Sequence, residues 1–217
     1  MTKLIIARHG NTFNPDDVPT RVGARTDIPL VEKGKEQAKA IGRYLKENNL
    51  VPDVAYSSTL KRTKETATIA LKEAGISLPV YELDIFNEID YGDDENKTEK
   101  DVISRIGKNA IEQWDKNAVV PDGWKVKPNE IIEDWQNFAH QLTKTHDVVT
   151  NEVMDIAETV LVVTSNGIAR FAPHITEDFD SFAKQHKIKL KTGALGILEF
   201  SQGKWRVTDW NIVPNLV

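Results

Sequence analysis

The chain has 217 residues, 28% of them charged, and a formal net charge of −5, as is typical of one globular domain. The negative charge argues against binding nucleic acid or an anionic membrane through bulk electrostatics. Because the sequence contains no cysteine, disulfides, thiol catalysis and cysteine-ligated metals are excluded. No long apolar stretch and no signal-peptide pattern are present, so we expect a cytoplasmic protein.

The first part of the chain alternates predicted strands and helices. The order strand, helix, strand, helix, strand is expected over residues 3–7, 32–48, 54–57, 59–74 and 78–82. In the first helix, Ala38, Ile41 and Leu45 recur at helical spacing, which predicts one buried face. Thr59 is a candidate N-cap for the second helix, and Gly75 is its expected end.

The middle of the chain, residues 84–155, has a different character. It contains an acidic stretch over residues 90–95 and two predicted helices near residues 99–114 and 129–142. We interpret it as a helical insertion, or cap, over the strand ends rather than as a separate domain. Residues 1–217 are therefore expected to form a single domain.

The last part of the chain returns to strand-like sequence. Residues 159–164 (Thr-Val-Leu-Val-Val-Thr) predict a buried strand, and a helix is expected to begin at Asn166-Gly167. Residues 194–200 and 204–210 flank Ser-Gln-Gly and predict a C-terminal hairpin. Alternating strands and helices predict an α/β fold, with a mostly parallel central sheet flanked by helices on both faces.

The most informative stretch is Arg8-His9-Gly10, directly after the first predicted strand. In an open α/β sheet, ligands bind outside the carboxyl ends of the strands. Arginine offers a planar set of donors suited to phosphate, and neutral histidine can act as a nucleophile. Taken alone, the tripeptide is better explained by a buried, hydrogen-bonded histidine beside a surface arginine.

Three further polar segments follow predicted strands or precede predicted helices. They are Thr26-Asp27-Ile28-Pro29-Leu30 with Gly34 and Gln37-Ala38, Ser57-Ser58 with Arg62 and Thr66-Ala67, and Glu88-Ile89-Asp90-Tyr91-Gly92 with Glu95. Together with Arg8-His9-Gly10, this ordered set resembles the histidine phosphatase superfamily, the phosphoglycerate-mutase-like proteins. The resemblance covers most of the chain and implies a phosphoglycerate-mutase-like fold.

The resemblance also implies roles for individual residues. His9 matches the nucleophile that becomes phosphohistidine, and Arg8 and Arg62 match the arginines that hold the phosphoryl oxygens. Glu88 matches the carboxyl group that protonates the leaving alcohol. Phosphoryl transfer requires positioning and positive charge around three oxygens, which agrees with this set of side chains.

No metal or other cofactor is expected. The two arginines supply the charge that Mg²⁺ would bring, and the other four histidines show no metal-binding spacing. The acidic residues Asp90, Asp93, Asp94 and Glu95 are expected to form a solvated loop rather than a cation site.

Asn166 departs from the pattern of the family. After the corresponding strand most active members carry a second histidine, whereas this chain reads Ser165-Asn166-Gly167. An asparagine amide donates hydrogen bonds but carries no charge. Asn166 and Gly167 are still expected to contact phosphate, because backbone amides at a helix start attract anions. The enzyme is expected to be slower than its relatives or differently tuned.

Three functions stay open at this point, and the sequence favours the first. The first is a phosphatase that hydrolyses a small phosphorylated metabolite through phospho-His9. The second is a phosphoglycerate mutase, an isomerase that uses the same phosphohistidine. The third is a catalytically impaired phosphate-binding or regulatory protein, as Asn166 suggests. The expected partner is a small phosphorylated substrate, with no nucleic acid and no membrane, and a homo-oligomer is left open.

Overall fold

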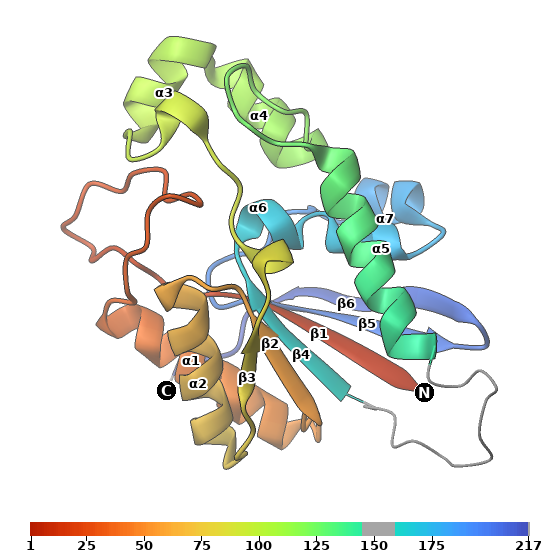
Figure 1. Ribbon diagram of the computed structural model, residues 1–217. Coiled ribbons are helices and arrows are strands. Elements are labelled where there is room, and N and C mark those ends of the chain that lie inside the picture. The colour runs from red at the N-terminus through yellow and green to blue at the C-terminus, as the bar shows by residue number, and fades with distance from the viewer. Residues whose placement is uncertain (145–158, 217) are drawn as a thin grey trace.

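A single six-stranded sheet forms the centre of the protein (Figure 1). The computed structural model describes residues 1–144 and 159–216, so the last part of the predicted insertion, residues 145–155, lies outside the described residues. The strand order is β3-β2-β4-β1-β5-β6. The strands are β1 (Thr2–Arg8), β2 (Val54–Ser57), β3 (Val80–Glu82), β4 (Thr159–Thr164), β5 (Leu195–Ser201) and β6 (Lys204–Ile212).

The sheet is mostly parallel, as the sequence predicts. Strand β4 pairs in parallel with both β1 and β2, and β2 pairs in parallel with β3. Strands β5 and β6 form the predicted C-terminal hairpin and extend the sheet in antiparallel fashion from β1. The predicted α/β fold class is confirmed.

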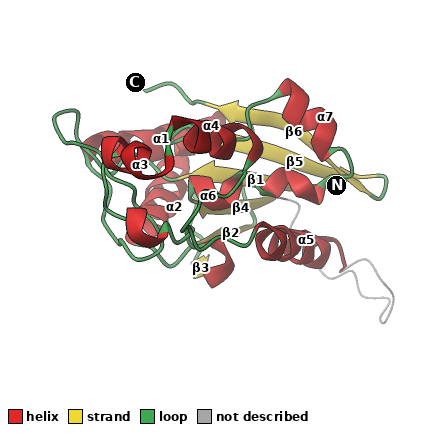
Figure 2. Ribbon diagram, turned by 90° about the horizontal axis from the view of Figure 1, so that it is seen from above, coloured by secondary structure: helices red, strands yellow, loops and turns green. Residues whose placement is uncertain are grey.

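Both faces of the sheet are covered, which explains why its central strands are almost entirely apolar. In β1, Leu4 and Ile6 belong to one apolar cluster, whereas Ile5 and Ala7 belong to a second cluster on the opposite face. The helices α1 (Glu32–Glu47) and α2 (Lys61–Ala74) pack on the second cluster, and α5 (Pro128–Lys144) and α6 (Asn166–Ala169) pack on the first. Figure 1 shows α1 and α2 on one side of the sheet and α5 on the other, and Figure 2, seen from above, shows the strands side by side from β6 to β3.

The segment predicted as one helix over residues 99–114 is two helices, so that prediction was wrong. The structure has α3 (Glu99–Ile106) and α4 (Lys108–Asn117), separated by Gly107. Gly107 has a φ of 83°, a backbone conformation that ends the first helix and that glycine adopts without strain. Both helices lie beyond the end of the sheet that carries α6 (Figure 1).

The remaining described helices are short. They are α7 (Phe179–Gln185) and the 3₁₀ helices η1 (Asp84–Phe86), η2 (Gly92–Asp94) and η3 (Ala172–Ile175). None of the described helices combines the length and the apolar composition that are required to cross a bilayer.

The predicted capping role of Thr59 was wrong. Helix α2 begins at Lys61, whose backbone N–H donates to Asp27 Oδ1 at 2.7 Å, so the carboxylate that satisfies the first turn comes from a distant segment. The backbone N–H and the hydroxyl of Thr59 both donate to Asn87 Oδ1, each at 2.9 Å. Thr59 therefore ties the start of α2 to the segment that carries Glu88. At the other end, Gly75 adopts a φ of 76° and ends the helix as predicted.

The acidic stretch is only in part the solvated loop that the sequence suggested, because Asp93 alone of its four acidic residues is exposed. Asp94 and Glu95 are both buried. Asp94 pairs with Arg105 and accepts a hydrogen bond from Trp124 Nε1 at 2.7 Å. Glu95 accepts a hydrogen bond of 2.7 Å from the backbone N–H of Arg25. Their partners hold the segment that follows Glu88 in a fixed conformation.

Candidate active site

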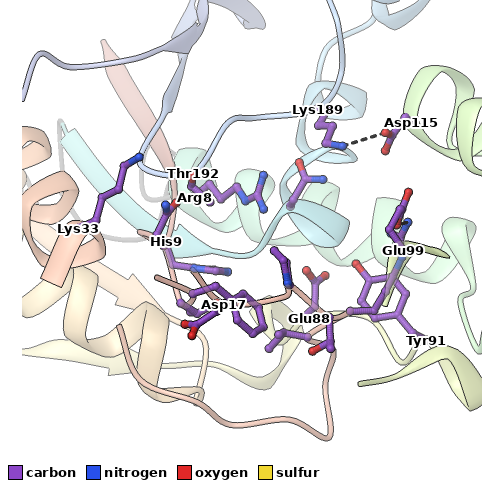
Figure 3. Close-up of a pocket in the computed structure, with 18 of the residues that line it drawn as sticks. Arg8, His9, Asp17, Lys33, Glu88, Tyr91, Glu99, Asp115, Lys189 and Thr192 are labelled. Atoms are coloured by element: carbon purple, nitrogen blue, oxygen red, sulfur yellow. Dashed lines mark hydrogen bonds and ion pairs between the residues drawn. The ribbon is translucent and has the colours of Figure 1, made fainter. Parts of the chain in front are cut away.

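A pocket of about 650 Å³ opens at the carboxyl ends of β1 and β4. Figure 3 shows Arg8, His9 and Glu88 among the side chains around it. Of the six residues that the sequence singled out, four line this pocket: Arg8, His9, Glu88 and Asn166. Arg62 and Gly167 lie behind this lining, where both are buried. Segments that are far apart in the sequence thus meet at one edge of the sheet.

His9 is held in a single tautomer. Its Nδ1 lies 2.7 Å from the carbonyl oxygen of Gly10, which can only accept a hydrogen bond. Nδ1 therefore carries the proton, and Nε2 of the neutral ring has a free electron pair. Burial lowers the pKa of His9 well below its usual value, and the charges of Arg62 and Arg8 lower it further. The ring is neutral at physiological pH and has the form that a nucleophile needs.

Gly10 allows a close approach between the His9 loop and helix α1. A Cβ on Gly10 would overlap the backbone carbonyl of Gly34, near the start of α1. The backbone N–H of Gly10 also donates to Thr66 Oγ1 at 3.1 Å, which joins the loop to α2. The glycine after His9 is required by packing, and these contacts fix the position of the histidine.

Two arginines present buried donors that lack acceptors. Arg8 Nη1 donates to the carbonyl oxygen of Leu190 at 2.7 Å, and Arg62 Nη1 donates to that of Thr26 at 2.8 Å. The Nε atoms of both arginines are buried and have no hydrogen-bond partner within the described part of the chain. Buried charged donors without acceptors are costly, and an anionic ligand would satisfy them.

Glu88 is a buried carboxyl group beside these cations. Its Oε1 accepts a hydrogen bond of 2.9 Å from the N–H of Ile89, and its Oε2 accepts one of 3.4 Å from the N–H of Gly167. A Cβ at Gly167 would overlap Glu88 Oε1, so glycine is needed for this approach. Burial raises the pKa of Glu88, and Arg62 opposes that rise only in part. A carboxyl group that keeps its proton to higher pH can act as a general acid.

Asn166 presents its amide at the start of α6. Its Oδ1 accepts a hydrogen bond of 3.1 Å from the backbone N–H of Leu190. Within residues 1–144 and 159–216, no group accepts a hydrogen bond from Asn166 Nδ2. This amide nitrogen is therefore a neutral donor in the pocket wall. Since the carbonyl of Leu190 also accepts from Arg8, the backbone N–H and carbonyl of one residue orient both side chains.

The outer wall of the pocket contains residues that the sequence did not single out. Trp114 and Asp115 come from α4, Lys189 follows α7, and Arg170 directly follows α6. Arg170 is 1% exposed, yet it lines the pocket. One signal was available, because Arg170 is four residues after Asn166 and so lies on the same side of a helix. The contributions of α4 could not be found without its tertiary position.

The sequence is similar to known phosphoryl-transfer proteins over its whole length. The sequence profile of the histidine phosphatase superfamily (branch 1) matches residues 4–213. A Bacillus subtilis (strain 168) protein, named uncharacterized phosphatase PhoE, is 30% identical over 218 residues, covering 100% of this chain and 97% of that protein. Phosphoglycerate mutase 1 of Saccharomyces cerevisiae is 33% identical over 123 residues, covering 56% of this chain and 49% of the mutase.

Solved structures share the fold at lower sequence identity. The α-ribazole phosphatase of Shigella flexneri superposes with a TM-score of 0.71 at 18% identity, over 98% of both chains. A phosphoserine phosphatase of Entamoeba histolytica, crystallised with 3-phosphoglyceric acid, gives a TM-score of 0.71 at 23% identity, again over 98% of both chains. At these identities the two solved structures show a shared fold only. The family profile and the Bacillus relative show similarity in the sequence as well. The chain belongs to branch 1 of the histidine phosphatase superfamily.

Proposed function

We propose that the protein is a metal-independent phosphatase that hydrolyses a small phosphorylated metabolite through a phosphohistidine on His9. The observation that carries the proposal is the state of His9, whose ring is neutral with Nε2 unprotonated. Arg8 and Arg62, which influence its pKa, supply positive charge beside it. A neutral imidazole next to two guanidinium groups is suited to attack a phosphate ester.

The proposed reaction has two steps. In the first, His9 Nε2 attacks phosphorus, the bond to the ester oxygen breaks, and Glu88 gives its proton to the departing alcohol. In the second, water attacks phosphorus and the bond between phosphorus and His9 Nε2 breaks, while the Glu88 carboxylate takes a proton from that water, which releases inorganic phosphate and the neutral imidazole. Arg8 and the Asn166 amide line the pocket and are proposed to hold the phosphoryl oxygens. Arg62 and the N–H of Gly167, now 3.4 Å from Glu88 Oε2, are proposed to reach those oxygens from behind the lining once a phosphoryl group is bound. Glu88 returns to its protonated form, so each step balances.

A panel of substrates tests the proposal against the mutase alternative. The mutase alternative is supported by the similarity to the yeast mutase over 123 residues. The purified protein is incubated with simple phosphate esters, and separately with 3-phosphoglycerate plus 2,3-bisphosphoglycerate. The proposal expects release of inorganic phosphate to exceed isomerisation. Isomerisation faster than phosphate release would establish a mutase instead.

Asn166 is proposed to limit the rate. Replacing it with histidine is expected to raise kcat/KM on a simple aryl phosphate by about tenfold, because a charged donor stabilises the transition state more than a neutral one. Asn166→Asp is the matched control, since it keeps the acceptor for the Leu190 N–H but adds negative charge and should lower activity. The measurement is kcat/KM for the three proteins on one substrate.

A histidine variant that folds normally and is no faster contradicts the rate-limiting role of Asn166. In that case the hydrogen bond from Leu190 to the amide carbonyl would be a tuned feature of the native site. Absence of turnover in both the wild type and Asn166→His would favour the impaired phosphate-binding protein.

Activity is expected to be independent of divalent metal. The guanidinium groups of Arg8 and Arg62 supply the positive charge that the transferred phosphoryl group requires. Incubation with a chelator, followed by an assay on an aryl phosphate, should leave kcat unchanged. Loss of activity that only added Mg²⁺ restores would overturn this expectation.

A further inference from the structure

Four side chains form a group on the outer wall of the pocket, and the proposed chemistry does not use them. We call this group the Arg170 cluster; it consists of Arg170, Trp114, Asp115 and Lys189. All four line the same pocket as His9. Three segments contribute to it: α4, the residue after α6, and the chain that follows α7.

The guanidinium of Arg170 is fixed in place by two backbone carbonyls and an aromatic ring. Its Nε donates to the carbonyl oxygen of Asn166 at 3.2 Å, and its Nη1 donates to that of Trp114 at 2.6 Å. Its central carbon lies 4.0 Å from the centre of the Trp114 ring. The Nη2 group has a weaker partner, because Asp115 Oδ1 is 3.8 Å away, beyond hydrogen-bond distance. A rigid guanidinium thus keeps one edge available.

The charges within the cluster do not balance. Asp115 Oδ2 accepts a bond of 2.8 Å from Lys189 Nζ (Figure 3). One carboxylate therefore serves two cations, and the cluster carries an excess of one positive charge. Burial lowers the pKa of Arg170 to about 10, so the side chain is still protonated at neutral pH. A buried cation whose only cluster carboxylate is 3.8 Å away and shared with Lys189 is incompletely compensated, and an anionic ligand would complete its pairing.

The cluster lies close to the reacting groups. The charges of Glu88 and Arg8 both act on the pKa of Arg170, and the Arg170 side chain is bonded to the backbone of Asn166. Glu88 is the residue proposed to protonate the departing alcohol. A substrate group in contact with the cluster therefore belongs to the part of the molecule that leaves.

We infer that the Arg170 cluster binds a carboxylate on the leaving alcohol, so that the preferred substrate is the phosphate ester of a hydroxy acid. A carboxylate supplies the single negative charge that the cluster lacks and can accept the free Nη2 hydrogen bond. A second phosphate would bring more negative charge close to Asp115, and a neutral hydroxyl would leave the excess charge uncompensated. This inference rests on the proposed phosphatase function.

The test compares phosphate esters of hydroxy acids of increasing chain length with the corresponding amides. Each pair differs only in the charge at the recognition end. For the chain length that reaches the cluster, kcat/KM should favour the acid over the amide by about tenfold or more. Arg170→Gln should bring this ratio close to one, mainly through a higher KM for the acid.

Two further variants keep the test decisive if Arg170→Gln does not fold. Lys189→Met should lower the acid-to-amide ratio, and Asp115→Asn should raise it by removing the competing carboxylate. Lys187→Met is the matched control, because this exposed lysine does not line the pocket and its loss should leave the ratio unchanged. A wild-type ratio near one at every chain length would overturn the inference. So would a ratio that none of the cluster variants changes.

Failure of the inference can be separated from failure of the proposed function. A wild-type protein that hydrolyses the amides and aryl phosphates but shows no preference for acids retains the phosphatase function and loses the inference. A protein that hydrolyses no ester loses the phosphatase function. Calorimetric binding of non-hydrolysable phosphonate acids and amides to that protein then decides the inference, since tighter binding of the acids supports it and equal binding contradicts it.

Discussion

His9→Ala is expected to lower kcat on any phosphate ester by about 10³-fold or more, because it removes the nucleophile. The variant should keep its fold, since His9 makes one hydrogen bond to the neighbouring Gly10 carbonyl. Steady-state kinetics on an aryl phosphate, with circular dichroism to check folding, measure the effect.

His140→Ala is the matched control for that experiment. His140 is exposed on α5 and does not line the pocket, so its loss should leave kcat unchanged. A folded His9→Ala protein with normal turnover would show that another group attacks phosphorus.

Glu88→Gln should slow esters with poor leaving groups by about 10²-fold or more and should affect aryl phosphates far less. An alkyl alcohol departs with difficulty unless it is protonated, whereas a phenolate needs less help. Glutamine keeps the shape and one oxygen to accept the Ile89 N–H, so the variant tests the proton rather than the fold. Equal losses on both classes of ester would indicate a structural role for Glu88.

The pH dependence of activity, compared between the wild type and Glu88→Gln, gives a second test of the role of Glu88. Glu88 acts as an acid only when protonated, so activity on alkyl esters should fall as pH rises through its raised pKa. His9 acts only when neutral, and its lowered pKa should keep the enzyme active at pH values below the usual histidine range. Glu88→Gln should lose the alkaline fall, while ionisation of the substrate affects both enzymes alike. An unchanged alkaline limb in the variant would contradict the role of Glu88.

Features that depend on local sequence pattern were predicted well. The apolar run that became β4 is buried on both faces, so its composition alone marks it as a central strand. Helix α1 begins and ends close to its predicted bounds because Ala38, Ile41 and Leu45 form a continuous buried face. His9 directly follows β1 and Asn166 lies two residues after β4, and both side chains line the pocket.

Features that depend on distant partners were not predicted. Thr59 has a residue type typical of an N-cap, yet its hydrogen bonds go to Asn87, which no local pattern reveals. Asp94 looked like a solvated acid, but Arg105 and Trp124 bury it from positions beyond its own segment. The break between α3 and α4 is different, because it does have a local signal. Gly107 interrupts the helical pattern, and this glycine ends α3 although the pattern on either side of it looks continuous.

The outer wall of the pocket shows the same limit. Arg170 gains its environment from Trp114 and Asp115 on α4, and the position of α4 over the strand ends is a tertiary property. The residues proposed for phosphoryl transfer follow strand ends and could be found by motif. The residues inferred to recognise the rest of the substrate come from α4 and from the segments that follow α6 and α7.

Trapping the phosphorylated enzyme tests the central claim most directly. The wild-type protein is mixed with an aryl phosphate, quenched during turnover and digested for mass spectrometry at alkaline pH. We expect one phosphoryl group on the peptide that contains His9, stable in alkali and lost in acid, and absent from His9→Ala. An acid-stable phosphoryl group on another residue, such as Ser57 or Ser58, would contradict the assignment of His9 as the nucleophile.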